Sequence, residues 1–566
     1  MHKLLSRTLI VALLLLAGNA AGCTSFRDYV HNGFKVGPNY QTPAAPVAAH
    51  WIEYNDKRIH SAQDDPAGWW TVLNDPLLNN LMVNAYRQNL TLREAGYRIL
   101  AARAQLGIVT GQFFPQQQTA SGNYTRFGIA DTYFSQYNFG FNLAWELDFW
   151  GRFRRAIISA DDALQASVFD YDDVLVTLLG DVASSYVQVR TTQERIRLLD
   201  NIIRVQEDVL KFIEERLAAG KAATELDRAQ ARSNLKQSLS QRNQLLIDLQ
   251  TSQNQICILL GMPVQNLAQM LASAPNTSIP TTPDYVVVGV PADLLRRRPD
   301  VRRAERQAAA QAEQIGIAMS DWYPAFSITG TLGWQAASFS NLFSSHALNS
   351  FVAPGFQWNL LNYGRILNNV KLQDATFQQL VVAYQNTVLQ ADLDVENGII
   401  TFLQAQERAV NLRESVDEAW IALEVIVAQY EAGLAGIDFN RYATIQQTLV
   451  NQQDLWAQSR GQIGQGLIQV YRGLGGGWQI RLGPPPDQRG VLSRLPPPTE
   501  EVRPPAPMQI PPPVNPNGEP LPAPPRNAPP AAAPAAPAPP AANAPAIAPP
   551  IAPPAMPPAA APGPQL

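Results

Sequence analysis

Residues 145–152 read WELDFWGR, and residues 358–365 read WNLLNYGR. The second stretch follows the first at an offset of 213 residues, and the same offset aligns two Ala-Gly pairs further along the chain. Upstream, QLGI at 105–108 returns as QIGI at 314–317, at an offset of 209. Several landmarks in nearly one register are difficult to obtain by chance, so the sequence predicts a long internal repeat.

Alternating apolar and polar residues precede each Gly-Arg pair. In the first copy, residues 137–147 alternate aromatic or aliphatic side chains with Asn, Gly, Ala and Glu, and residues 119–127 form a weaker pattern. In the second copy, residues 326–334 and 356–360 alternate in the same way. A period of two predicts β-strands. Each copy therefore supplies two amphipathic strands.

Helical stretches are expected on both sides of the strands. Residues 81–112 and 301–320 are predicted to form helices that stop before Pro115 and Pro324, because proline cannot continue a helix. Apolar residues step by four and three along 412–430, and again 213 residues earlier, as in a coiled-coil seam.

The helices after each Gly-Arg pair are predicted to be unusually long. A helix over 152–218 would extend about 100 Å at roughly 1.5 Å per residue. Residues 81–112 and 225–260 together have a similar length, so two shorter helices are expected to stack end to end beside the long one.

The first residues resemble a secretion signal. Lys3 and Arg7 precede an apolar run at 8–16, and small residues follow it up to Cys23. The run is too short to span a bilayer and predicts a cleaved signal peptide. A cysteine directly after small residues resembles the bacterial lipoprotein box, which implies that Cys23 is acylated with palmitate-type chains. Thr24 then favours sorting to the outer membrane; the alternative is an ordinary signal with a chance cysteine.

The chain is expected to divide into five parts: a signal peptide at 1–22, a lipidated segment at 23–75, repeats at 76–275 and 290–478, and a tail at 484–566. The tail holds 32 of the 46 prolines and few large apolar residues. Such a composition cannot bury a core and predicts a disordered spacer.

Composition excludes several classes of function. The net charge is −4 and the one Arg-rich run is interleaved with acids, so nucleic-acid binding is not expected. The two cysteines and five histidines form no metal-ligand pattern. No nucleophile and base pair stands out, and paired acids such as Asp172 and Asp173 are interpreted as solvated helix faces. We therefore expect neither an enzyme nor a cofactor.

Four strands cannot close a barrel, and lipid does not tolerate open sheet edges. An eight-stranded barrel is filled by its own side chains. If these strands lie in a membrane, three chains with twelve strands are the smallest assembly with a plausible lumen, which predicts an α+β membrane protein built as a trimer.

The sequence resembles the TolC-like outer membrane factors, and more closely their lipoprotein branch, the NodT-type outer membrane subunits of RND-type efflux pumps. The resemblance rests on VGPNYQTP at 36–43, WELD at 145–148, PADLLRRRPDVR at 291–302 and YRGLGGGW at 471–478. It implies a homotrimer in which a twelve-stranded outer membrane β-barrel continues into a twelve-helix periplasmic α-barrel. A periplasmic adaptor and an inner membrane pump would deliver the substrates.

The resemblance also implies a gate at the periplasmic helix tips. Tyr430 matches a gate tyrosine, and Asp438 is the nearest candidate for an acidic ring. In the first copy Glu225 and Asp227 are the candidates, with Arg216 as a possible ion-pair partner. Simple N-capping is the alternative for Asp438 and Asp227.

Six residues of the repeated stretch are expected at the junction between barrel and tunnel. They are Trp145, Gly151, Arg152, Trp358, Gly364 and Arg365.

The predicted function is a passive outer membrane channel of a tripartite efflux system for drugs or other small molecules. A protein-secretion channel of the same fold and a non-channel trimeric lipoprotein are the alternatives. The last does not explain the aromatic strand ends at Tyr133, Tyr137 and Trp334, which are typical of interfacial girdles.

Overall fold

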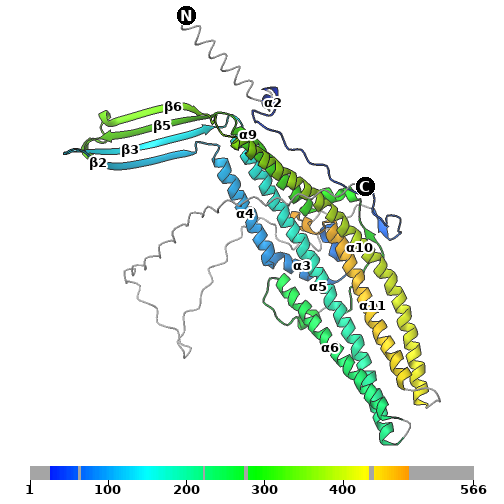
Figure 1. The fold of residues 1–566 in the computed structure, drawn as a ribbon. Coiled ribbons are helices and arrows are strands. Elements are labelled where there is room, and N and C mark those ends of the chain that lie inside the picture. Colours follow the sequence, from blue (N-terminus) through cyan, green and yellow to red (C-terminus); the bar gives the residue numbers. More distant parts are fainter. Residues whose placement is uncertain (1–25, 62–65, 221–222, 273–277, 433–438, 484–566) are drawn as a thin grey trace, which may run out of the picture. The chain divides into compact units, whose positions relative to one another are not determined.

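The structure is a computed structural model (Figure 1). It describes residues 26–61, 66–220, 223–272, 278–432 and 439–483. The predicted signal peptide, Cys23, Asp438 and the Pro/Ala-rich tail lie outside the described residues.

The long helices come in pairs of equal length, one from each repeat. They are α5 (Arg152–Ala218) and α10 (Arg365–Glu431), with 67 residues each; α6 (Glu225–Leu259) and α11 (Phe439–Gly473), with 35 each; and α4 (Leu90–Gly111) and α9 (Pro299–Ser320), with 22 each. α6 packs on α5, and α11 packs on α10. The internal repeat predicted from the sequence is confirmed in the helices.

Each 67-residue helix begins after a glycine in the left-handed conformation. Gly151 has φ +82° and Gly364 has φ +81°, backbone angles that residues other than glycine rarely adopt. At Gly151 an added Cβ would also lie 2.9 Å from the Cα of Lys35. Asp148 caps the start of α5, because its carboxylate accepts hydrogen bonds from the amides of Phe153 (2.9 Å) and Arg154 (3.0 Å).

The four strands form one antiparallel sheet in the order β2-β3-β5-β6, visible side by side in Figure 1. They are β2 (Gln117–Ile129), β3 (Thr132–Leu147), β5 (Ala325–Ala336) and β6 (Leu348–Gln357). The β3–β5 pairing joins the two repeats.

The alternation predicted through residue 360 is wrong in its last part, because β6 ends at Gln357. Beyond it, the Trp358 indole donates to the carbonyl of Trp322 (2.9 Å), and the chain turns toward α10 through Tyr363, with φ +50°.

The expected helix over 81–112 is two helices, α3 (Pro76–Gln88) and α4, which meet at Asn89. Asn89 has ψ 129°, so the helix cannot continue through it. Its side chain accepts from the amide of Leu92 (2.8 Å) and donates to the carbonyl of Leu259 at the end of α6 (2.9 Å). α4 and α6 are thus joined end to end, as expected.

The second repeat has an equivalent end-to-end contact between two helices, made by a different residue. Such an end-to-end contact is here called a splice. Arg298 precedes α9, and its guanidinium donates to the carbonyl of Gly473 at the end of α11 (2.9 Å). Arg298 follows Asn89 at the 209-residue offset. In both splices a carbonyl at the end of the 35-residue helix accepts a hydrogen bond from the side chain that stands just before the 22-residue helix.

Short elements complete the described part of the chain. They are α2 (Phe26–His31), α7 (Ala268–Ala272), α8 (Leu294–Arg297), the parallel pair β1 (Ile59–His60) and β4 (Val286–Val287), and the 3-10 helices η1 (Pro66–Leu73), η2 (Pro291–Asp293), η3 (Phe339–Asn341), η4 (Ser345–Ala347) and η5 (Trp478–Leu482). Within the described ranges, no helix combines the length and apolar character needed to cross a membrane.

The predicted coiled-coil seam is confirmed in part by burial. Val416, Leu423 and Ile426 of α10 are buried, as are Leu199 and Ile213 of α5. They belong to one apolar cluster at the far ends of the helical hairpins, where α5, α6, α10 and α11 contribute side chains.

The interpretation of Asp172 as a solvated side chain is wrong. Asp172 is fully buried, and Arg481 of η5 donates to its two oxygens at 2.7 and 2.9 Å. Burial raises the pKa of Asp172, and the Arg481 guanidinium opposes that shift. Asp173 is half-buried and pairs with Arg303 at 2.8 Å. These acids are structural because distant segments of the chain supply their partners.

Candidate functional site

The candidate acids at the tip of the first hairpin have different environments. Asp227 forms a capping box with Thr224, in which its carboxylate accepts from the Thr224 amide (2.9 Å) and the Thr224 hydroxyl accepts from the Asp227 amide (3.2 Å). Such reciprocal bonds fix the start of α6. Glu225 is exposed and lies 2.7 Å from Arg228, one turn further along the helix. Glu225 is therefore exposed at the tip as one member of an ion pair with Arg228.

Arg216 and Tyr430 meet across the two hairpins. Arg216 stands in the last turn of α5, and its guanidinium donates to the carbonyl of Tyr430 near the end of α10 (3.4 Å). The same guanidinium lies 4.5 Å from the ring centre of Phe212 and 5.9 Å from that of Tyr430. A cation placed over aromatic faces is attracted by their electron density. These contacts tie the first hairpin to the second.

Tyr430 is the centre of an aromatic cluster. Its ring lies 6.3 Å from Phe212, 6.2 Å from Phe439 and 6.3 Å from Tyr442, measured between ring centres. Burial raises the pKa of the Tyr430 hydroxyl, the charge of Asp227 adds to the shift, and Arg216 opposes it. The hydroxyl therefore stays protonated and can donate at neutral pH. Sequence reasoning identified Tyr430 and Arg216 but not the rings around them.

The tryptophans of the repeated stretch occupy equivalent places in the two copies. The Trp145 indole donates to the carbonyl of Phe113 (3.3 Å), as Trp358 donates to Trp322. Phe113 and Trp322 are separated by the same 209 residues as the rest of the upstream landmarks. Trp145 of β3 and Trp358, just beyond β6, thus each bind the segment that follows the preceding helix.

The two arginines of the repeated stretch differ in their surroundings. Arg152 lies 3.7 Å from Glu146 and 3.8 Å from Asp321, with nearly half of its side chain exposed. Arg365 is exposed at the start of α10. Both lie between the sheet and the long helices, but both side chains are largely exposed to solvent.

The strongest contacts at this junction come from arginines that sequence reasoning missed. Arg155 is fully buried and donates to the carbonyls of Val36 (2.7 Å) and Gly37 (2.9 Å) and to the carboxylate of Glu313 (2.6 Å). Its neighbour Arg154 donates to the carbonyls at positions 33 and 34 (2.6 and 2.8 Å). The two side chains hold residues 33–37, here called the strap, against the junction.

The sequence held no distinctive signal for this site. At the 213-residue offset Arg155 corresponds to Asn368, but the neighbouring Phe153 and Arg154 differ from their counterparts as well. Gly316 of α9 leaves the room that Arg155 fills, since an added Cβ there would overlap the guanidinium. Only the fold, which brings residues 33–37 and α9 to this side chain, reveals the site.

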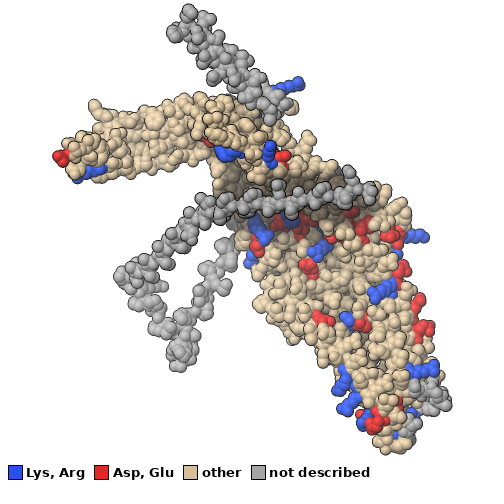
Figure 2. Space-filling model, in the orientation of Figure 1, with Lys and Arg blue, Asp and Glu red and all other residues tan. Residues whose placement is uncertain are grey.

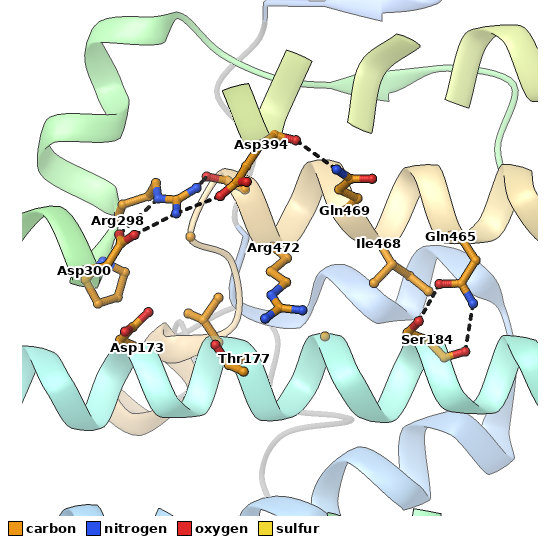
Figure 3. Close-up of a pocket in the computed structure, with 15 residues that line it drawn as sticks. Asp173, Thr177, Ser184, Arg298, Asp300, Asp394, Gln465, Ile468, Gln469 and Arg472 are labelled. Atoms are coloured by element: carbon orange, nitrogen blue, oxygen red, sulfur yellow. Dashed lines mark hydrogen bonds and ion pairs between the residues drawn. The ribbon is translucent and has the colours of Figure 1, made fainter. Parts of the chain in front are cut away.

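A polar cavity of about 480 Å³ lies beside the second splice (Figure 3). Figure 3 shows Arg298 bound to Asp300 and Asp394 at one end, while Ser184 and Gln465 bond at the other. Arg298 lies 2.7 Å from Asp300 and 3.1 Å from Asp394. Arg298, which forms the splice, holds both carboxylates by ion pairs, so this end of the cavity is part of the splice. In the described ranges, no group of His, Cys, Asp or Glu is arranged to hold a metal ion.

Comparisons with known proteins place the chain in a family. Residues 81–262 and 290–476 match the family described as outer membrane efflux protein. Nodulation protein T of Rhizobium leguminosarum bv. trifolii is 28% identical over 422 residues, covering 73% of this chain and 88% of that protein. The pyoverdine export outer membrane protein OpmQ of Pseudomonas putida is 29% identical over 429 residues, with the same coverage of 73% and 88%.

A solved structure of the outer-membrane channel OprN has the same fold. It superposes with a TM-score of 0.72 at 28% identity and covers 78% of this chain and 99% of its own. The resemblance to NodT-type outer membrane factors is therefore confirmed. The chain belongs to the outer membrane efflux protein family, a family of conduits, and its function is that of an outer membrane channel of an efflux system.

Proposed function

We propose that three copies of the chain form one closed twelve-stranded barrel in the outer membrane. Each copy contributes β2, β3, β5 and β6, and the long helices continue the barrel as a periplasmic tunnel. The observation that carries this proposal is a sheet with one mainly apolar face, one mainly polar face and two end strands, β2 and β6.

The two faces of the sheet differ in chemistry. Phe139 and Phe141 of β3 lie opposite Trp334 and Leu332 of β5 on one face. On the other face Thr331, Asn142 and Ser121 form a chain of hydrogen bonds, at 3.0 and 3.2 Å. Strands of membrane barrels direct apolar side chains to lipid and polar side chains to the lumen. This alternation favours a water-filled interior over a packed core.

The number of copies follows from closure. An open edge in lipid leaves backbone donors and acceptors without partners, at several kcal/mol for each group. Two copies would give eight strands, whose side chains fill the interior. Three copies give the smallest barrel with a lumen.

Interchain disulfides test whether β2 of one copy lies beside β6 of the next, and which side chains of the two strands share a face. Ser121 of β2 is changed to cysteine and combined in turn with a cysteine at each position from 349 to 353 of β6. Ser121 shares its face of the sheet with residues 349, 351 and 353. Crosslinked trimers are therefore expected only with those of these three positions that lie close to Ser121 of the neighbouring copy. The alternate positions 350 and 352 are the matched controls. A monomer in native mass measurements, or crosslinks without alternation, would refute the proposal.

We also propose that the hairpin tips form the periplasmic aperture. Arg216, Phe212 and Tyr430 fasten the α5 end to the α10 end, which favours a constricted tip. Glu225, and by its position Asp438, would add a ring of acidic charge with threefold symmetry. Like charges around one axis attract cations into the opening.

The partners and the anchor belong to the same proposal. We expect a periplasmic adaptor and an RND-type inner membrane pump to deliver drugs or other small molecules. The similarity to OpmQ, a pyoverdine export outer membrane protein, supports a small-molecule cargo. Acyl chains at Cys23 would hold the strap end of the chain at the outer membrane, with residues 484–566 as a spacer.

A further inference from the structure

The two strand hairpins end in different ways. β2 and β3 are joined by a tight turn at residues 130–131, whereas β5 and β6 are joined by residues 337–347, here called the β5–β6 loop. This loop contains the 3-10 helices η3 and η4. A loop of this length has room to fold back over the sheet.

Ring contacts show that the β5–β6 loop lies on the apolar face. The ring of Phe339 is 5.8 Å from Tyr137, and the ring of Phe343 is 5.8 Å from both Phe139 and Trp334. Tyr137, Phe139 and Trp334 share the face that carries Phe141 and Leu332. The loop therefore covers the outer end of the face assigned to lipid above.

The aromatic side chains of the loop remain exposed despite these contacts. Phe339 is 66% exposed and Phe343 is 62% exposed, whereas Leu342 between them is buried at 5%. Two large rings on the outside of a loop are costly in water, since each leaves most of its apolar surface hydrated.

The charge distribution separates this loop from the first hairpin. Residues 322–364 contain no Lys, Arg, Asp or Glu, and the loop's polar groups are Asn341, His346 and serine hydroxyls. The tip of the first hairpin carries Arg126 and Asp131, and Figure 2 shows the sheet as an uncharged surface with charges at its tip. Aromatic rings beside small hydroxyls are typical of the boundary between acyl chains and headgroups.

From this geometry we propose that the β5–β6 loop is a membrane-interface anchor, in which Phe339 and Phe343 insert into the outer leaflet beside the barrel. The occupant of this surface is lipid at the acyl-chain and headgroup boundary. The inference rests on the proposed barrel, because the loop reaches lipid only if the apolar face does. It adds a contact that fixes the depth of the second hairpin in the membrane.

Site-directed spin labelling of the full chain in lipid vesicles tests the loop and the barrel separately. A single cysteine replaces Phe343, Phe141 or Asn142; the last two are neighbours on β3 that point to opposite faces. Cys23 is changed to Ala in every variant, and Cys257 is fully buried and does not compete for label. Accessibility to oxygen, which partitions into lipid, is compared with accessibility to a water-soluble nickel complex.

We expect the Phe343 label to resemble the Phe141 label, with a higher oxygen-to-nickel ratio than the Asn142 label. If Phe141 and Asn142 give the same ratio, the proposed barrel is wrong. If those two differ but the Phe343 label is reached mainly by nickel, or by neither reagent, the loop faces water or another subunit. Either of these last results overturns the anchor and leaves the barrel intact.

Discussion

Replacing Arg155 by leucine should release the strap from the sheet-to-helix junction. The side chain is fully buried, and its partner Glu313 keeps only 6% of its side-chain surface exposed. Removing the guanidinium leaves the Glu313 carboxylate and the carbonyl of Val36 without their donor, whereas the carbonyl of Gly37 keeps a hydrogen bond from the Asn32 side chain (3.0 Å). Breaking a buried pair in this way costs about 3–5 kcal/mol.

The cost can be measured as local opening of the strap. The Val36 amide donates to the carbonyl of Trp150 (3.0 Å), so its hydrogen exchange reports whether the strap is bound. With about 1.4 kcal/mol for each factor of ten, protection of the strap should fall by roughly two to three and a half powers of ten. Hydrogen exchange of the purified protein, read by mass spectrometry of strap peptides, gives this number.

Arg152→Leu is the matched control, three residues earlier in the same helix. Its side chain is 46% exposed and its ion pairs are long, at 3.7 and 3.8 Å, so its loss should cost less than about 1 kcal/mol. The double variant Arg155→Leu with Glu313→Leu should recover part of the protection, because no buried charge is left unpaired. Unchanged strap exchange in Arg155→Leu, or an equal change in Arg152→Leu, would refute this reasoning.

Three further predictions concern the anchor, the aperture and the splice. Cys23→Ala should abolish palmitate labelling while the trimer still assembles, and label retained by the variant would contradict the lipoprotein interpretation. In planar bilayers Tyr430→Ala should raise the resting conductance and Asp438→Ala should reduce cation selectivity. Glu418 is exposed on the shaft of α10, and Glu418→Ala should change neither property. Equal effects of the three substitutions would place the gate elsewhere. Asn89→Ala should destabilise the protein by about 1–3 kcal/mol through the lost cap and the unpaired carbonyl of α6, seen as a lower thermal midpoint.

The sequence alone determined the repeated elements. Residues 152–218 are free of proline and follow a glycine, and the helix has those bounds in the structure. The alternation over 137–147 and 326–334 placed β3 and β5 correctly. Such features are local, because backbone freedom and side-chain period act within a few residues of the chain.

Only the tertiary structure decided where the charges lie. Asp172 reads as a surface acid in its own helix, but Arg481 reaches it from more than 300 residues away and the pair is enclosed. Arg155 likewise acquires its role from the strap and α9, which its own helix does not reveal. Burial of a charge depends on which distant group can neutralise it, since an unpaired charge cannot leave water. The periodicity of one segment contains no information about that partner.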